Sequence, residues 1–210
     1  MTDVEFFCET CHFFDIVGNH DDEIAYHKKL HRKYHDNYVN GVKATPLKSD
    51  KVISELDGFR VILVSPRSTL SQRKRAERIA LRGKMGTDFD FASYHANDLK
   101  HEDYPLVFIG IINDRAISFL VLRKTTGTAK VTWQHYDKEA TEPIPSLPDV
   151  RWGISMVWTL ENKRRKGYVK QLIGMASKYV EQDISELAWF APFTDFGHSL
   201  AKAISRNEVI

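Results

Sequence analysis

Cysteine and histidine residues near the N-terminus have the types and the spacing of metal ligands. Cys8 and Cys11 form a C-x2-C pair, and because they are the two cysteines of the chain, a disulfide framework is excluded. His27, His31 and His35 follow at intervals of four residues, which places them on one face of a helix. Two thiolates and two imidazoles complete a tetrahedral Zn²⁺ site. The pattern predicts a structural Cys2His2 zinc site with Cys8, Cys11, His27 and His31 as ligands.

Two alternatives to this ligand set stay open. His35 is the next candidate ligand, since a helix can present either neighbouring pair of histidines, and His12 and His20 are weaker candidates. Alternatively, the cysteines are small buried residues, and the segment HKKLHRKYH is the solvated basic face of a helix.

A basic loop with a glycine is the second feature whose residues suggest chemistry. Arg164 and Arg165 follow a β-rich run, GISMVWTL, and Lys166 and Gly167 open a segment with apolar residues at helical spacing, KGYVKQLIGMASKYVEQ. Free N–H groups at a helix N-terminus attract phosphate, and a glycine lets a ligand approach the backbone. The loop therefore predicts a phosphate site, and a solvated basic turn is the ordinary alternative.

The remaining patterns predict the elements that position these residues. Helical spacing indicates a helix in SQRKRAERIALRGK, with Arg75, Arg78 and Arg82 on one face that we expect to be solvated. The fold expected is α+β, with a mostly antiparallel sheet flanked by helices.

The domains expected are a finger at 1–40, a linker at 41–58 and a larger domain at 59–210. The predicted strands are FRVILVS, the hairpin LVFIGIIN–AISFLVLRKT, KVTWQHY, GISMVWTL and ELAWFAP; DKEATEPIPSLPD is an expected loop and FGHSLAKAIS a last short helix.

Composition narrows the class of protein. Hydrophobic residues make up 42% of the 210 residues and charged residues 28%, as in ordinary globular proteins. Thirty Lys and Arg residues against 28 Asp and Glu residues give a formal charge of +2, too balanced to indicate a nucleic-acid binder by charge alone. Because the chain shows neither an apolar run of about 18 residues nor a signal peptide, we expect an intracellular location without a membrane partner.

The basic loop and the finger together resemble a known family. The strand–R-x-x-G–helix arrangement resembles the acetyl-CoA pyrophosphate loop of GNAT N-acetyltransferases, with Arg164, Gly167 and Val169 at the motif positions. With CETC…DDEIAYHKKLH added, the chain resembles the sister-chromatid cohesion (establishment-of-cohesion, ESCO-type) N-acetyltransferases, which join a small Cys2His2 finger to a GNAT domain. The segment AWFAPFTDFG resembles a diverged form of that family's Asp-Pro-Thr-Pro-Asp-Gly motif.

This resemblance implies acetylation of a protein lysine from acetyl-CoA, with Zn²⁺ in a small ββα-type finger. It implies a chromosome-associated protein as the substrate class, and a location in the nucleus if the source is eukaryotic or in the cytoplasm otherwise. The β-strand would offer backbone groups to the pantetheine arm, and the loop after it would hold the phosphates. The implied cofactor-binding residues are Val157, Trp158, Thr159, Arg164, Arg165, Lys166, Gly167, Tyr168, Val169 and Lys170.

The catalytic residues depart from the family's pattern. The family's glutamate after the phosphate loop falls at Gly174, and the first aspartate of its C-terminal motif falls at Ala191. Asp195 matches the second aspartate, so we expect it to orient the substrate or act as the base, with Ser155 assisting. The ordinary interpretations are a helix N-cap for Asp195 and a plain strand residue for Ser155. His198 lies nearby without a family counterpart.

Two other function classes stay open. The first is a degenerate acetyltransferase fold that serves as a binding module, which the replaced carboxylates favour. The second is a zinc-finger protein that binds nucleic acid through the basic residues of 27–35 and 73–82. Because a lone finger binds DNA weakly, direct nucleic-acid binding is the less favoured of the two.

Overall fold

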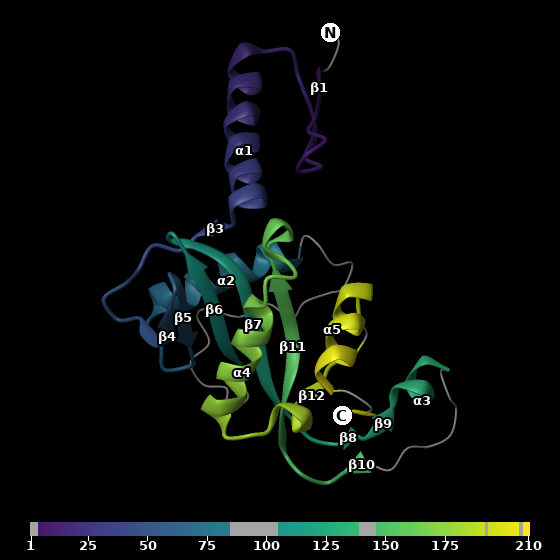
Figure 1. Ribbon diagram of the computed structural model, residues 1–210. Helices are drawn as coiled ribbons and strands as arrows, with labels where there is room; N and C mark the ends of the chain where they lie inside the picture. Colours follow the sequence, from purple (N-terminus) through teal and green to yellow (C-terminus); the bar gives the residue numbers. More distant parts are fainter. Residues whose placement is uncertain (1–3, 85–104, 139–145, 192, 206–207) are drawn as a thin grey trace.

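An antiparallel sheet forms the body of the molecule, and a hairpin with a long helix stands on it (Figure 1). The computed structural model describes residues 4–84, 105–138, 146–191, 193–205 and 208–210. The strand order is β12-β11-β7-β6-β5-β4, with β3 paired to β7, and only the β11–β12 pair is parallel among the described strands of this sheet. The strands are β3 (Val42–Lys43), β4 (Lys51–Leu56), β5 (Phe59–Val64), β6 (Leu106–Ile112), β7 (Arg115–Thr125), β11 (Arg151–Thr159) and β12 (Ala188–Trp189).

Helices and small strand pairs surround this sheet. The helices are α1 (Asp21–Asn40), α2 (Leu70–Lys84), α3 (Trp133–Asp137), α4 (Tyr168–Val180) and α5 (Asp195–Ser205), with 3₁₀ turns η1 (Glu161–Lys163) and η2 (Ile184–Glu186). The small strands are β1 (Val4–Phe7), β2 (Phe14–Val17), β8 (Thr128–Ala129), β9 (Val131–Thr132), β10 (Ser146–Leu147) and β13 (Glu208–Val209). None of the helices in these ranges is both long enough and apolar enough to cross a bilayer.

The two long helices beside the sheet, α2 and α4, cover its opposite faces (Figure 1). Phe119 and Leu120 are consecutive on β7 and fully buried, so their side chains point to opposite faces. Phe119 lies against α2 at Gly83. Leu120 pairs with Phe108, whose ring contacts Tyr179 of α4 at 5.8 Å. The predicted α+β fold with a mostly antiparallel sheet is confirmed.

The N-terminal segment is the expected ββα unit. Strands β1 and β2 pair antiparallel, and α1 runs beside them before it meets the body of the molecule (Figure 1). The helix ends at Gly41, whose φ of 85° is one that L side chains rarely adopt. A Cβ at this position would collide with the carbonyl oxygen of Ala116 on β7. Gly41 therefore lets the chain turn tightly from the finger into β3.

Two predicted elements near the C-terminal half differ in the structure. The segment KVTWQHY, expected as a strand, gives only β9 before α3 begins, because the Thr132 hydroxyl accepts a hydrogen bond from the His135 N–H at 3.2 Å and caps the helix. Of the expected loop at 137–149, residues 139–145 lie outside the described residues, and Ser146–Leu147 forms β10 against β8.

Residues 41–58, expected as a linker, instead contribute two strands to the central sheet. β3 pairs with β7 and β4 pairs with β5, and Val42 and Ala44 are buried. Polar side chains from α2 hold the segment between these strands. Gln72 donates a hydrogen bond to the Ser49 carbonyl at 2.7 Å. Part of this polar segment is therefore held by side-chain contacts to α2, while the division into a finger and a larger domain stays a prediction.

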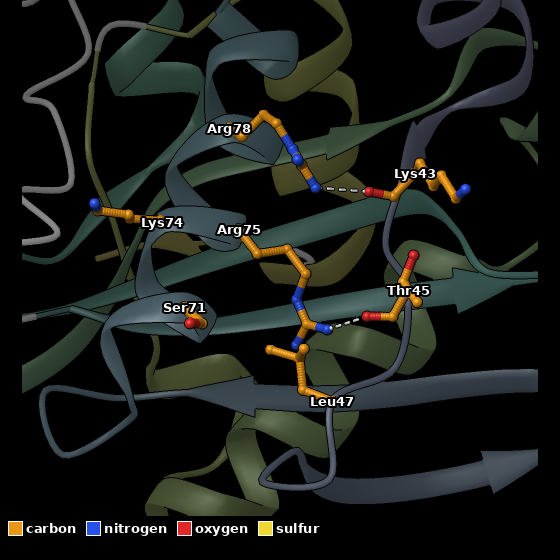
Figure 2. Close-up of a pocket in the computed structure, with 7 residues that line it drawn as sticks. All are labelled: Lys43, Thr45, Leu47, Ser71, Lys74, Arg75 and Arg78. Carbon is orange, nitrogen blue, oxygen red and sulfur yellow. Dashed lines mark hydrogen bonds between the residues drawn. The ribbon is translucent and has the colours of Figure 1, made fainter.

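The arginines of α2 are not all solvated, contrary to expectation. Arg75 and Arg82 are both only 6% exposed. Arg75 donates to the Thr45 carbonyl at 2.7 Å, and Arg78 donates to the Lys43 carbonyl at 2.9 Å (Figure 2). Between α2 and the segment that they hold lies a groove of about 390 Å³. The residues that line it are Lys43, Thr45, Leu47, Ser71, Lys74, Arg75 and Arg78.

The Arg75 guanidinium also forms a buried ion pair with Asp50. Burial raises the pKa of the Asp50 carboxyl, but the hydrogen bonds from Arg75 and from the Leu47 N–H lower it below its ordinary value. Since the folded-state pKa is lowered, this carboxylate stabilises the fold above its unfolded pKa. That contribution is lost as the pH falls through the folded pKa.

Asp50→Ala is expected to lower the free energy of unfolding at neutral pH by about 3–5 kcal/mol, because it leaves Arg75 buried without its counter-ion. The measurement is urea unfolding, with Asp149→Ala as the control. Asp149 is exposed and lies 3.6 Å from Arg151, so its loss should cost about 0–1 kcal/mol. The gap between wild type and Asp50→Ala should narrow at acidic pH, and equal stability of the two variants would contradict the role of the pair.

Candidate active site and metal centre

The turn between β1 and β2 forms a knuckle that faces α1. The Cys8 N–H donates to the Phe13 carbonyl at 3.0 Å, and the His12 N–H donates to the Cys8 carbonyl at 2.8 Å. This brings Cys8 and Cys11 to one side of the turn. His31 and His35 of α1 face them, and the ligand atoms of the four residues all lie within 4.8 Å of one another. The four groups form a candidate metal centre.

The predicted ligand His27 lies outside this cluster, and the alternative His35 takes its place in it. His27 lies one helical turn before His31, beyond the reach of the knuckle. There its Nδ1 makes a short contact with the Asp15 carboxylate of β2. Histidines on the same face of α1 therefore have different contacts. His27 binds the hairpin through Asp15, and His35 joins the cluster.

The residues of the cluster fit Zn²⁺. Cys11 is buried, and the Nε2 atom of His31 is buried without a hydrogen-bond partner among the described residues. A bound cation would satisfy that nitrogen. The Cys11 backbone, with smaller contributions from neighbouring side chains, lowers the pKa of the Cys8 thiol to about 6, which favours the thiolate that metals bind. Two sulfurs and two imidazole nitrogens are the donor set of structural zinc sites.

Strands β11 and β12 separate soon after they meet, which opens the sheet. They pair in parallel at two positions, Gly153 with Ala188 and Ile154 with Trp189. At Ser155 the register between β11 and β7 shifts, as at a β-bulge. Beyond Ile154, no described strand pairs with this side of β11. The backbone of Val157–Thr159, predicted to meet the pantetheine arm, lies along this opening.

The basic loop lies at the end of β11, between η1 and α4. Gly167 has a φ of 83° and precedes α4, and a Cβ added there would meet no described atom within 4 Å. The backbone is therefore open to a ligand, and the first N–H groups of α4, from Tyr168 to Lys170, have no carbonyl partner within the helix. This open, positively polarised helix end fits a phosphate group.

The side chains of this loop divide into two groups. Arg165, Lys166 and Lys170 are exposed and extend the positive charge around Gly167. Arg164 turns inward: its Nε donates to the Thr159 carbonyl at 3.3 Å, and its guanidinium lies 4.8 Å from the ring centre of Phe196 on α5.

The remaining predicted cofactor-binding residues pack against the body. Trp158 is buried, with its ring facing Arg82 at 5.5 Å. Tyr168 packs against Phe59, with ring centres 4.9 Å apart, and Val169 is half-buried. The loop therefore contains side chains that brace it and backbone that stays open.

The two predicted catalytic residues lie near the opening without touching each other. The Ser155 hydroxyl donates to the Val121 carbonyl at 3.4 Å. Asp195 is the exposed first residue of α5. It does not cap the helix, because the Thr194 hydroxyl accepts the Gly197 N–H at 3.1 Å and fills that place. Their roles in catalysis stay predictions.

An aromatic cavity of about 370 Å³ adjoins the point where β12 leaves β11. Ala191, the position of the family's first aspartate, lies in its wall, and none of the described lining side chains is acidic. The backbone helps to close it, since the Trp189 N–H donates to a main-chain oxygen of Ile210 at 2.7 Å. The lining residues are Thr125, Thr128, Ala129, Val131, Tyr136, Ala188, Trp189, Phe190, Ala191, Phe193 and Ile210.

A histidine–aspartate pair lies beside this cavity. The His198 Nε2 is 2.9 Å from an Asp137 carboxylate oxygen, and Lys202 donates to the other oxygen at 2.5 Å. The Lys202 ammonium, with His198, holds the pKa of Asp137 below its ordinary value. Burial raises the pKa of the cavity residue Tyr136, so its hydroxyl keeps its proton. Sequence reasoning noted His198 but missed Tyr136 and Trp189, although aromatic residues are frequent in both segments.

Comparisons with known proteins support this picture. No family model matches the chain. Its sequence is 23% identical to N-acetyltransferase ECO1 of Kluyveromyces lactis over 211 residues, which cover 82% of this chain and 77% of that protein. Its fold is similar to the xEco2 acetyltransferase domain bound to a K105-CoA conjugate, with a TM-score of 0.61, 18% identity and coverage of 78% of this chain and 98% of that one.

A second structure of the xEco2 acetyltransferase domain gives a TM-score of 0.58 with 16% identity, over 77% of this chain and 94% of that one. The expected likeness to the cohesion acetyltransferases is thus confirmed in sequence and in fold.

Proposed function

We propose that this protein is an acetyl-CoA-dependent N-acetyltransferase that modifies a lysine of another protein, as its likeness to ECO1-type acetyltransferases suggests. One observation carries the proposal. The parallel pair β11–β12 opens after two residue pairs, and the opening lies between the phosphate-type loop at Gly167 and the aromatic cavity at Trp189. A two-substrate transferase needs such an arrangement, with one site on each side of the reacting atoms.

The residues of the loop and of β11 would hold acetyl-CoA, which supplies an acetyl group activated as a thioester. The N–H groups at the start of α4 would bind the phosphates, supported by the exposed side chains of Arg165 and Lys166. The backbone of Val157–Thr159 would hydrogen-bond to the amide groups of the pantetheine arm. Both contacts use backbone groups, which are fixed in place before the ligand arrives.

The aromatic cavity would receive the acceptor lysine. Its aromatic walls suit the aliphatic stem of a lysine. The amine must be neutral to attack the thioester carbonyl, and burial lowers the pKa of a lysine amine. Burial among these aromatic side chains therefore favours the reactive form, although Gly174 and Ala191 replace the family's carboxylates. Asp195 is the proposed basic or substrate-orienting group, and Ser155 is proposed to assist it.

A chromosome-associated protein is the proposed substrate class, with a nuclear location if the source is eukaryotic, because the resemblance is to cohesion acetyltransferases. The replacement of two family carboxylates favours a second candidate function: a binding module with an acetyltransferase fold. Such a module would bind acetyl-CoA and transfer nothing.

One experiment separates the two functions. The zinc-loaded protein is incubated with acetyl-CoA and a set of lysine-containing peptides, and mass spectrometry follows acetylated lysine while a thiol reagent follows free CoA. Enzyme-dependent acetyl-lysine formed together with CoA supports the transferase. If acetyl-CoA binds but neither product forms above the uncatalysed rate with any peptide, the binding module is the better account.

Tyr136→Ala is expected to lower kcat/KM for a lysine peptide about ten-fold while the Kd of acetyl-CoA stays unchanged, because Tyr136 lines the cavity and not the loop. The measurement combines steady-state kinetics with an acetyl-CoA titration. Tyr26→Ala is the control, since Tyr26 is 59% exposed on α1. An unchanged kcat/KM in Tyr136→Ala would remove the cavity from the acceptor site.

A further inference from the structure

The last turn of the finger helix α1 touches the segment directly before the cofactor loop. The Tyr38 hydroxyl donates to the Glu161 carboxylate of η1 at 3.2 Å. The Asn162 side-chain amide donates to the carbonyl of Val39 at 2.9 Å. Both contacts join residues 123 positions apart in the chain. They link the finger to η1, which ends directly before the loop begins at Arg164.

Tyr38 also connects this contact to the metal centre. Its ring meets the ring of His12, in the knuckle, edge-on at 6.3 Å. The ligand His35 lies three residues earlier on the same helix, within one turn of Tyr38. From the body side, the buried Arg82 guanidinium lies 4.4 Å from the ring centre of Tyr38 and 5.5 Å from that of Trp158 on β11. Tyr38 therefore contacts the knuckle, η1 and Arg82. The Arg82 guanidinium in turn packs against Trp158 of β11, the strand proposed to hold the cofactor.

The cofactor loop needs support of this kind because its backbone is unusual. Arg165, with φ 61°, and Gly167, with φ 83°, are both left-handed within three residues. A non-glycine residue keeps such a conformation only where its surroundings enforce it. Arg164 braces one side of the loop, and Glu161 lies 3.8 Å from the Arg164 guanidinium. Contacts that fix Glu161 and Asn162 therefore also restrict the loop.

The finger has so small a core that its folding is expected to depend on bound metal. None of the side chains of α1, all of which lie in the described part of the chain, is buried. A unit with so little core is held together by its metal, whose binding energy is its folding energy. Metal release would free the knuckle, and with it the His12 contact to Tyr38, while α1 stays anchored elsewhere by Asp36, which accepts from Arg115 at 2.6 Å.

We propose that Tyr38 and Asn162 are positioning residues that couple the metal centre to the cofactor loop, so that metal in the finger strengthens acetyl-CoA binding. The inference rests on the proposed function, since it concerns the same loop. By linkage, acetyl-CoA strengthens metal binding by the same factor. The finger then acts as a support for the cofactor site and not only as an appendage.

The test is a calorimetric titration of acetyl-CoA into zinc-loaded and chelator-treated protein. Removing zinc from the wild type is expected to raise the Kd about five- to ten-fold, as for a typical coupling between two sites. The combined variant Tyr38→Phe with Asn162→Ala should show a raised Kd with zinc present and no further change after chelation. In steady-state kinetics it should raise the KM for acetyl-CoA while kcat stays unchanged.

Asn40→Ala is the matched control. Asn40 lies in the same turn and donates to Asp36 at 2.9 Å without contacting η1, so its variant should respond to chelation as the wild type does. An equal Kd with and without zinc in the wild type would overturn the coupling, and so would a combined variant that still responds to chelation. A zinc-loaded wild type that does not bind acetyl-CoA would instead overturn the proposed function, and the coupling with it.

Discussion

Gly167→Glu is expected to abolish acetyl-CoA binding, with a Kd raised about a hundred-fold or more. The new carboxylate would face the phosphates at the N-terminus of α4, where a like charge costs several kcal/mol. Space is open around Gly167 among the described residues, so the side chain would occupy the position the ligand needs without disturbing the core. The measurement is a calorimetric titration of acetyl-CoA, with thermal unfolding to verify that the variant is folded.

Two controls separate the effect of a carboxylate at this position from the effects of backbone strain and of the overall net charge. Gly167→Ala imposes the same backbone strain at a φ of 83° without the charge, and it should keep binding within about ten-fold. Lys178→Gln changes the net charge by the same amount in the last turn of α4, away from the loop, and should bind as the wild type does. Wild-type affinity in Gly167→Glu would show that the phosphates lie elsewhere.

His35→Ala is expected to lower zinc affinity about a hundred-fold or more, whereas His27→Ala leaves it unchanged. His35 belongs to the cluster whose ligand atoms lie within 4.8 Å of one another, and losing one of four ligands breaks the tetrahedral site. His27 contacts Asp15 instead, so its loss affects the hairpin and not the metal. A competition titration against a chromophoric chelator measures both affinities.

The two histidine variants are each other's control, since they remove the same side chain from the same helix face. Zinc loss in His27→Ala with retention in His35→Ala would restore the ligand set expected from spacing alone. Equal losses in both would mean that the helix as a whole, rather than one pair of histidines, determines the site.

Local patterns predicted most of the elements that position the site. The hairpin of β6 and β7 was evident from two apolar runs around Asn113 and Asp114, which both have a φ near 50–60°, as this turn requires. The segment with apolar residues at helical spacing forms α4, and its residues Leu172 and Ile173 are buried. Periodicity succeeds in these elements because each one buries a single face against the sheet.

Features that depend on distant contacts were not predictable in this way. Histidines spaced by four share one helix face, so spacing cannot distinguish His27 from His35; the position of the knuckle along α1 decides between them. The buried pair of Asp50 and Arg75 joins residues 25 positions apart and holds the segment between β3 and β4, expected as a linker, against α2. A polar residue with a buried partner looks the same in sequence as a solvated one.

The aromatic cavity shows the same limit more strongly. Its walls come from the end of β7, from α3, from β12 and from the C-terminal residue, so no single segment carries its pattern. The sequence did locate Ala191, because a motif covers that position, but not the aromatic side chains around it. Loop residues at Gly167 were predictable for the opposite reason, since a phosphate site at a helix N-terminus is formed by consecutive residues.

The central claim is that the loop from Arg164 to Lys170 binds acetyl-CoA, and a calorimetric titration of acetyl-CoA into the zinc-loaded wild-type protein tests it most directly. We expect saturable binding at one site, with a Kd in the micromolar range, which corresponds to a binding free energy of about −8 kcal/mol. A folded, zinc-loaded protein that takes up no acetyl-CoA at millimolar concentration would contradict the account and leave a scaffold with an acetyltransferase fold.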